Sequence, residues 1–263
     1  VCLGKQFPND QARRDHFLKR LAEMLKDPAF RAQDGFPRAT DEAILALSDP
    51  PYYTACPNPF LGDFIDNYGR QYNVGEQYLR EPLAVDASVG KTDTIYKAHS
   101  YQTKVPHLAI VPSILHYTEP GDVVLDGFSG SGMTGIAGQW CGKASAAYRH
   151  QLEVEWKTEG RQAPKWGVRR VLLNDLSPAA TFISANYNLP CKADRLVVEA
   201  RSILRKLESE TSWMYQTDHS DGISKGSINF TVWSEVYSCP ECAGEIIFTD
   251  AALNDEDDEV AKV

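Results

Sequence analysis

The sequence of 263 residues is 43% hydrophobic and 24% charged, which is typical of a folded protein with a sizeable core. Its formal net charge of −9 argues against a generally basic nucleic-acid binder. Positions 250–263 contribute −5 of this charge, so the rest of the chain carries −4 and can still form a local basic groove. The sequence shows no apolar stretch long enough to cross a bilayer and no leader, so we expect a soluble, cytoplasmic protein without a membrane partner.

The first third of the chain is predicted to hold a helix, a strand and loops. Apolar residues recur at steps of three and four over 11–26, which predicts an amphipathic helix. The short apolar run at 43–48 predicts a buried strand that ends at Asp49. Residues 53–95 mix Tyr, Pro, Asn and Gly with charges, and we expect loops with one short helix there.

The middle of the chain alternates between predicted helices and strands. Pro106 is expected to open a helix, because proline is favourable in a first helical turn. The other expected elements are strands at 123–125 and 168–173 and helices at 134–140, 178–187 and 194–207. Residues 148–166 are polar and predicted to be exposed. This order predicts an α/β protein with a Rossmann-like fold and a mostly parallel sheet.

The C-terminal part is predicted to be β-rich. Residues 228–238 alternate in polarity, and 245–249 resembles another strand. We expect a core over 1–210, a linker over 211–227 and a β segment with an acidic tail over 228–263. An average sheet has about five to six strands, more than we find, so we interpret the chain as the N-terminal part of a longer protein with an incomplete sheet.

The segment Asp49-Pro50-Pro51-Tyr52 is the first candidate site. A carboxylate and a carbonyl held by rigid prolines can accept the two hydrogens of an exocyclic amine, and an aromatic ring can stack on the base that carries it. Tyr53 and Phe60 are further candidates for stacking. Taken alone, the segment is also consistent with a rigid turn.

The second candidate site is a glycine-rich turn between a predicted strand and a predicted helix. It consists of Asp126, Gly127, Phe128, Ser129, Gly130, Ser131 and Gly132. Glycines let the backbone approach a ligand closely at a helix start. Asp175 ends the next strand, where a carboxylate can bind both hydroxyls of a ribose, although such a residue also serves as a helix cap. Together these residues predict a nucleotide-like cofactor.

These motifs, together with His99-Ser-Tyr-Gln-Thr-Lys-Val-Pro106, resemble the amino-group DNA methyltransferases. Their order resembles the permuted arrangement of that family, with the catalytic motif ahead of the glycine-rich turn. The family uses S-adenosylmethionine (SAM) to methylate N6 of adenine or N4 of cytosine in DNA. Gly127 stands where the family has proline, and Val105 is an addition before Pro106.

The resemblance implies roles for particular residues. Asp126 to Gly132 would surround the methionine part of SAM and Asp175 would bind the ribose, while Thr103 and Lys104 would lie near the methionine carboxylate. Phe128 would flank the cofactor or pack in the core. Asp49 through Tyr52 would be catalytic, with adenine favoured over cytosine because of the aspartate. A role in restriction-modification is implied by resemblance alone.

Cys239 and Cys242 have the spacing of one half of a zinc ribbon. The other ligands would come from a missing C-terminal part or a partner subunit, or the thiols bind nothing, and we favour the first explanation. A different class of function stays open: a non-catalytic fragment that binds nucleic acid or acts as a scaffold. A related enzyme that methylates RNA or a protein amide is a further alternative.

Overall fold

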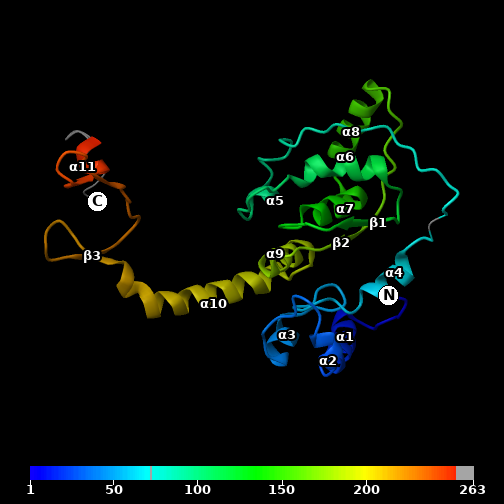
Figure 1. Cartoon of the computed structure of the whole chain (residues 1–263), viewed down its shortest axis with the longest axis horizontal. Coiled ribbons are helices and arrows are strands. Elements are labelled where there is room, and N and C mark those ends of the chain that lie inside the picture. Colours follow the sequence, from blue (N-terminus) through cyan, green and yellow to red (C-terminus); the bar gives the residue numbers. More distant parts are fainter. Residues whose placement is uncertain (72, 253–263) are drawn as a thin grey trace. The chain divides into compact units, whose positions relative to one another are not determined.

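The computed structural model describes residues 1–71 and 73–252. The chain divides into two compact units, Val1–Pro190 and Cys191–Val263, which are described separately below (Figure 1). The boundary falls ahead of the helix that follows residue 192. The core that we expected over 1–210 therefore extends past the first compact unit.

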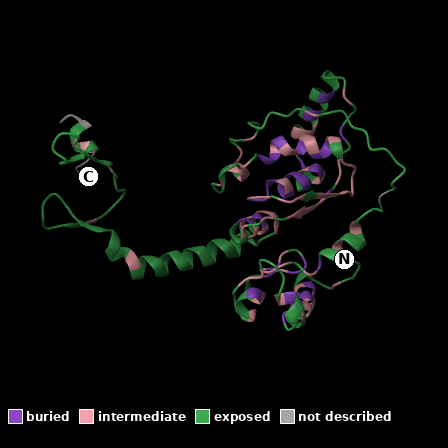
Figure 2. Cartoon of the chain, viewed as in Figure 1, coloured by how far each residue is buried: buried purple, intermediate pink, exposed green. Residues whose placement is uncertain are grey.

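The first unit begins with four helices, α1 (Asp10–Met24), α2 (Pro28–Arg31), α3 (Asp41–Leu47) and α4 (Leu61–Tyr68). The helix predicted over 11–26 is confirmed as α1, and the Asn9 side chain accepts the Ala12 N–H to cap its first turn. Buried side chains from these helices and their connections form one hydrophobic cluster, which includes Phe17, Leu21, Leu25, Phe30, Ile44 and Phe60. Figure 2 shows these buried segments in purple.

The strand predicted over 43–48 is wrong, because α3 occupies most of that segment. The Thr40 hydroxyl accepts the Ala43 N–H, and Asp41 and Glu42 are acids in the first turn, where the helix dipole favours negative charge. A short apolar run fits a buried strand and a buried helix equally well, so the flanking cap residues decide between them.

The α/β part of the first unit holds α5 (Thr94–Lys97), α6 (His107–Tyr117), β1 (Val123–Asp126), α7 (Met133–Lys143), α8 (Ala146–Thr158), β2 (Arg170–Leu173) and α9 (Pro178–Asn188). The two strands pair in parallel, with Val123 opposite Arg170 and Asp126 opposite Leu173. The helices predicted at Pro106, 134–140 and 178–187 and the strands predicted at 123–125 and 168–173 are confirmed.

A second hydrophobic cluster lies under α6, α7 and α8. It includes Val111, Leu115 and Cys141, together with Leu152 and Trp156 from α8. The prediction that 148–166 is exposed is wrong for these last two residues, which lie four positions apart on one face of a helix. The Trp140, Tyr148 and Trp166 rings pack edge to face beside this cluster.

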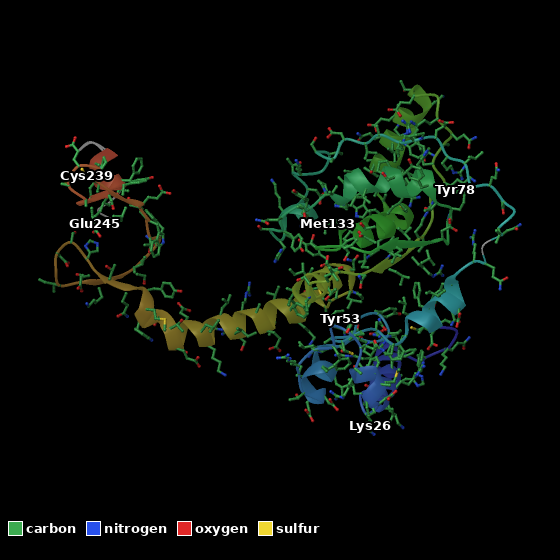
Figure 3. All side chains as sticks on the ribbon, in the orientation of Figure 1. Lys26, Tyr53, Tyr78, Met133, Cys239 and Glu245 are labelled. Carbon is green, nitrogen blue, oxygen red and sulfur yellow. The ribbon has the colours of Figure 1, made fainter. Side chains whose placement is uncertain are left out.

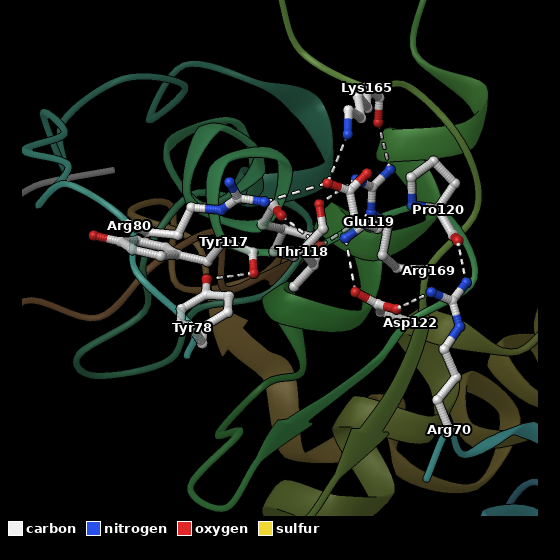
Figure 4. A network of polar contacts seen from close by, with 11 residues as sticks. Arg70, Tyr78, Arg80, Tyr117, Thr118, Glu119, Pro120, Asp122, Lys165 and Arg169 are labelled. Carbon is white, nitrogen blue, oxygen red and sulfur yellow. Dashed lines mark hydrogen bonds and ion pairs between the residues drawn. The ribbon is translucent and has the colours of Figure 1, made fainter. Parts of the chain in front are cut away.

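A polar network around Glu119 fixes the entry to β1 (Figure 4). The Glu119 carboxylate accepts from Arg80 at 3.3 Å and from Lys165 at 2.9 Å. The Arg169 guanidinium donates to the Thr118 carbonyl and hydroxyl oxygens, and Arg70 pairs with Asp122. These contacts tie the segment that precedes α5 to the start of the sheet.

The second unit contains α10 (Ala193–Thr211), a 3-10 helix η1 (Ser212–Tyr215) and two antiparallel hairpins, followed by α11 (Phe248–Ala252). The hairpins pair β3 (Gln216–Asp218) with β4 (Lys225–Ser227) and β5 (Val236–Ser238) with β6 (Glu245–Ile247). The predicted helix at 194–207 is confirmed as α10, whereas the β prediction at 228–238 holds only for its last three residues. The acidic run 255–259 lies outside the described residues.

The chain is therefore a mixed α/β protein, with a small parallel sheet in its first unit and antiparallel strands in its second. The parallel sheet of the described residues has two strands, fewer than we expected, because the segment before Asp49 is helical. Among the described helices, none combines the length and the apolar character that crossing a membrane requires.

Candidate active site

The segment 49–53 forms a tight, pinned turn directly after α3. The Asp49 N–H donates to the Tyr53 carbonyl at 2.9 Å, and the Tyr53 N–H donates back to the Asp49 carbonyl at 3.1 Å. The Asn58 side-chain amide donates to the Pro51 carbonyl at 3.0 Å. The main chain of the motif is thus fixed on both sides, which is what a preorganised pair of acceptors requires.

Arg13 of α1 contacts the two acceptors that the sequence singled out. Its Nη2 donates to Asp49 Oδ1 at 2.9 Å, and its Nη1 donates to the Pro50 carbonyl at 2.6 Å. Asp10 binds the same guanidinium from the other side, with its Oδ1 at 2.9 Å from Nε. Arg13 is 3% exposed. Sequence analysis missed this residue, because it lies on the buried face of α1 with Phe17 and Leu21, where a charged side chain is not expected.

Two tyrosines of the motif face different neighbours. The Arg13 Cζ lies 4.7 Å from the centre of the Tyr52 ring, which is 56% exposed. Desolvation of its hydroxyl, with the contact to the Cys2 thiol, raises the pKa of Tyr52 to about 12, so the ring stays neutral at physiological pH. The Tyr53 ring packs edge to face with Phe182 of α9, at 6.4 Å between centres. The motif therefore lies against the helix that follows Asp175 (Figure 3).

The glycine-rich turn links β1 to α7 and depends on two glycines with left-handed backbone angles. Gly130 has φ of 51° and Gly132, the N-cap of α7, has φ of 80°. Asp126 holds the turn from inside: its Oδ1 accepts the Phe128 N–H at 3.1 Å and its Oδ2 accepts the Thr134 hydroxyl at 2.5 Å. The Ser131 side chain is buried beside them.

Asp175 is joined directly to the glycine-rich turn. Its Oδ2 accepts the Gly130 N–H and its Oδ1 accepts the Ser177 N–H, each at 2.9 Å. A carboxylate has about four acceptor positions, so this one retains capacity for further donors such as ribose hydroxyls. The structure brings together two residues that are 45 positions apart in the sequence. Asp175 also begins the turn into α9, which agrees with the alternative prediction that it serves as a helix cap.

Side chains in the turn and next to Asp175 fit a bound nucleoside-like cofactor. The Ser129 hydroxyl is buried without a hydrogen-bond partner, and a buried polar group of this kind favours a ligand that completes it. Phe128 in the turn and Leu176, which follows Asp175 in the sequence, are apolar side chains that are 82% and 86% exposed. Exposed apolar side chains of this size can cover the flat face of a base.

Thr103 and Lys104 lie just before α6. The Lys104 ammonium donates to the carbonyls of Tyr96 and His99 and to the Tyr187 hydroxyl, at 2.7, 2.9 and 3.0 Å. An ammonium has three hydrogens, and all three already have acceptors. In this structure Lys104 therefore joins the segment before α6 to α9. Thr103 has a φ of 62° and an exposed side chain.

A cavity of about 440 Å³ lies between the segment 51–53 and the strands β1 and β2. Pro51, Tyr52 and Tyr53 line it on one side, and Leu125, Leu173 and Asn174 line it at the carboxyl ends of β1 and β2. Asn174 also accepts the Ser129 N–H through its carbonyl, so this wall adjoins the glycine-rich turn. Within the described residues, the lining includes neither Asp49, Pro50 nor the turn itself. Ligands of open α/β sheets bind at this edge of the strands.

Cys239 and Cys242 lie in the turn between β5 and β6 in the second unit. Hydrogen bonds from the backbone N–H groups of Cys242 and Glu241 lower the pKa of the Cys239 thiol, which favours the thiolate that metals bind. Among the described residues, however, no group of three His, Cys, Asp or Glu side chains is placed to hold a metal ion. The structure gives no support for zinc at this pair.

The fold is that of a mixed α/β protein, and its candidate site combines the segment 49–53 with the glycine-rich turn. Residues 26–148 match a family model described as DNA methylase. This match covers a little under half of the chain and includes both motifs. It confirms the resemblance to the amino-group DNA methyltransferases over those residues. No curated protein and no solved structure matches the chain significantly.

Proposed function

We propose that this chain transfers a methyl group from SAM to the exocyclic amine of a DNA base, with N6 of adenine favoured over N4 of cytosine. The observation that carries the proposal is the cavity that Tyr52 and Tyr53 share with the ends of β1 and β2. The DNA methylase match covers the two tyrosines and β1. The preference for adenine rests on Asp49, which the resemblance associates with that base.

In this mechanism Asp49 and Pro50 act on the amine. An exocyclic nitrogen is a poor nucleophile because its lone pair is delocalised into the ring of the base. The Asp49 carboxylate and the Pro50 carbonyl accept one amine hydrogen each, which favours a tetrahedral nitrogen and frees its lone pair. Both acceptors are preorganised because the turn is pinned at Asp49, Pro51 and Tyr53.

Tyr52 provides the surface on which the base rests after it has left the duplex. Its ring is exposed along the cavity and stays uncharged. Pro51 lies beside it in the cavity wall. Because the nitrogen attacks directly, the main contribution of these residues is proximity and orientation.

The residues assigned to the cofactor are Asp126 through Gly132, with Asp175 for the ribose hydroxyls. When bound there, SAM supplies an activated methyl group on a positively charged sulfur. Lys104 has no ammonium hydrogen left for a carboxylate, so we assign it to positioning the segment before α6, and Thr103 with it. Phe128 is exposed in the glycine-rich turn and is assigned to the face of the cofactor rather than to the core.

The test is methyl transfer by Asp49→Asn compared with Asp63→Asn. Both aspartates pair with an arginine of α1, Asp49 with Arg13 and Asp63 with Arg20, so the second variant controls for the loss of an ion pair. We expect Asp49→Asn to lose roughly 100-fold in the rate of transfer, as for other losses of a preorganised group that acts in the transition state. Its affinity for SAM, measured by calorimetry, is expected to stay unchanged.

The substrate is read from the same reactions by mass spectrometry of the nucleosides released from the DNA. The expected product is 6-methyladenine. Detection of 4-methylcytosine instead would mean that the target base is cytosine, with the same mechanism. Full transfer activity in Asp49→Asn would refute the role of the carboxylate. An absence of both SAM binding and methylated nucleosides with the unmodified chain would refute the function.

A further inference from the structure

The position of the Arg13 guanidinium repeats the contacts that the mechanism assigns to the target base. A guanidinium is flat and carries N–H donors along its edge, as an adenine or cytosine amine does. Arg13 donates one N–H to Asp49 Oδ1 and another to the Pro50 carbonyl. It also lies over the Tyr52 ring. The two acceptors and the stacking surface are thus all in contact with one side chain of the protein.

This arrangement opposes methyl transfer while it lasts. The amine nitrogen becomes positively charged as it takes up the methyl group, and a cation beside it raises the energy of that state. Donation from Arg13 also draws electron density from the two oxygens that are needed to accept the amine hydrogens. The guanidinium therefore has to leave before Asp49 and Pro50 can act on a base.

Arg13 is poised to leave at a limited cost in electrostatic energy. Asp10 binds it through Nε and Nη2, at 2.9 and 3.1 Å, and the Asp10 side chain is 82% exposed. A retreat toward Asp10 keeps the cation paired while it gives up Asp49 and Pro50. In addition, a cation in the first turns of α1 is disfavoured by the helix dipole, so the position of Arg13 depends on these pairings.

We propose that Arg13 fills the place of the target base in the unliganded protein and is displaced when a base enters. This proposal rests on the proposed function, because it uses the roles assigned there to Asp49, Pro50 and Tyr52. It identifies the base subsite as the space now held by the guanidinium, over the Tyr52 ring. Base binding then has to compete with an internal ligand, which weakens the apparent affinity.

The experiment compares Arg13→Met with Arg20→Met for binding of a short single-stranded oligodeoxyadenylate, measured by fluorescence anisotropy. Both arginines lie on α1 and pair with an aspartate, and the Arg20 side chain is the more exposed of the two, so Arg20→Met shows how much affinity the loss of one positive charge costs. Removal of the internal competitor is expected to make Arg13→Met bind about ten-fold more tightly than the unmodified chain, whereas Arg20→Met should bind no more tightly than the unmodified chain. Equal or weaker binding by Arg13→Met would overturn the proposal.

A measurement on the unmodified chain covers the case in which Arg13→Met does not fold. In an NMR spectrum, the Nη1–H resonances of Arg13, whose acceptor is the Pro50 carbonyl, should be protected from solvent exchange in the free protein and lose that protection when the oligonucleotide is added. The Arg20 resonance serves as the internal control. Unchanged protection of Arg13 at saturating oligonucleotide would refute displacement.

These results are separable from those that test methyl transfer. If the chain methylates DNA but Arg13 stays in place, the displacement proposal fails alone. If Arg13 is displaced but no methylated nucleoside forms, the base subsite stands and the reaction assigned to it fails.

Discussion

Replacement of Gly132 by alanine tests whether the glycine-rich turn has the geometry described above. Gly132 has a φ of 80°, a conformation that disfavours any residue with a Cβ. A Cβ at this position would lie 2.2 Å from the Ser184 hydroxyl and 2.8 Å from the Asn188 amide nitrogen. Both neighbours belong to α9, and Ser184 is buried, so the contact cannot be relieved by turning a side chain into solvent.

The magnitude follows from two separate costs. A left-handed backbone costs a residue with a Cβ about 1–2 kcal/mol. Overpacking a filled site costs about 1–3 kcal/mol more. We therefore expect Gly132→Ala to lower the free energy of unfolding of the first unit by about 2–5 kcal/mol. For a domain of this size that corresponds to a fall in Tm of roughly 5–20 °C.

The assay is urea denaturation followed by circular dichroism, with Gly127→Ala as the matched control. Gly127 lies in the same turn, has no left-handed φ and would place its Cβ in open space. A change of less than about 0.5 kcal/mol is expected there. The double variant Gly132→Ala with Ser184→Gly should recover part of the packing cost and keep the backbone cost. Equal stability of Gly132→Ala and Gly127→Ala would refute this description of the turn.

Two further predictions concern buried titratable groups. Burial lowers the pKa of His107, so the unfolded chain takes up a proton at a higher pH than the folded one. The free energy of unfolding should therefore fall by up to about 1.4 kcal/mol per pH unit as the pH drops below about 6.5. In thermal unfolding curves His107→Phe should remove this pH dependence, whereas the same change at the exposed His150 should not. Burial raises the pKa of the Cys141 thiol to about 11. In the folded protein, iodoacetamide at about pH 8 should therefore label the exposed Cys191 and spare Cys141. The labelling is measured by mass spectrometry, and equal labelling of the two thiols would contradict the burial of Cys141.

The sequence allowed much of the α/β part to be predicted, because its signals are local. Val123–Asp126 and Arg170–Leu173 are short apolar runs bounded by turns, and the glycine-rich turn stands directly between a strand and a helix. The segment 43–48 was mistaken for a strand because its apolar residues have no diagnostic period, while its evidence for a helix lay in the capping residues before it.

The candidate site was predictable in its chemical groups and not in their contacts. Asp49, Pro50 and Tyr52 could be singled out from their order along the chain. The arginine that contacts all three comes from a helix 36 positions earlier, and nothing in the local sequence distinguishes Arg13 from its neighbour Arg14. Likewise, the family resemblance placed Lys104 near a carboxylate, but its ammonium group donates to three acceptors of the protein, one of them on α9.

The distribution of tryptophans gives the two compact units different optical properties. In the first unit Trp156 is buried and Trp140 and Trp166 pack against Tyr148, whereas Trp213 and Trp233 of the second unit are 65% and 89% exposed. Emission from the shielded indoles lies at shorter wavelength and resists a collisional quencher such as acrylamide. With acrylamide present, tryptophan emission can therefore follow loss of structure in the first unit, because the exposed tryptophans of the second unit are quenched.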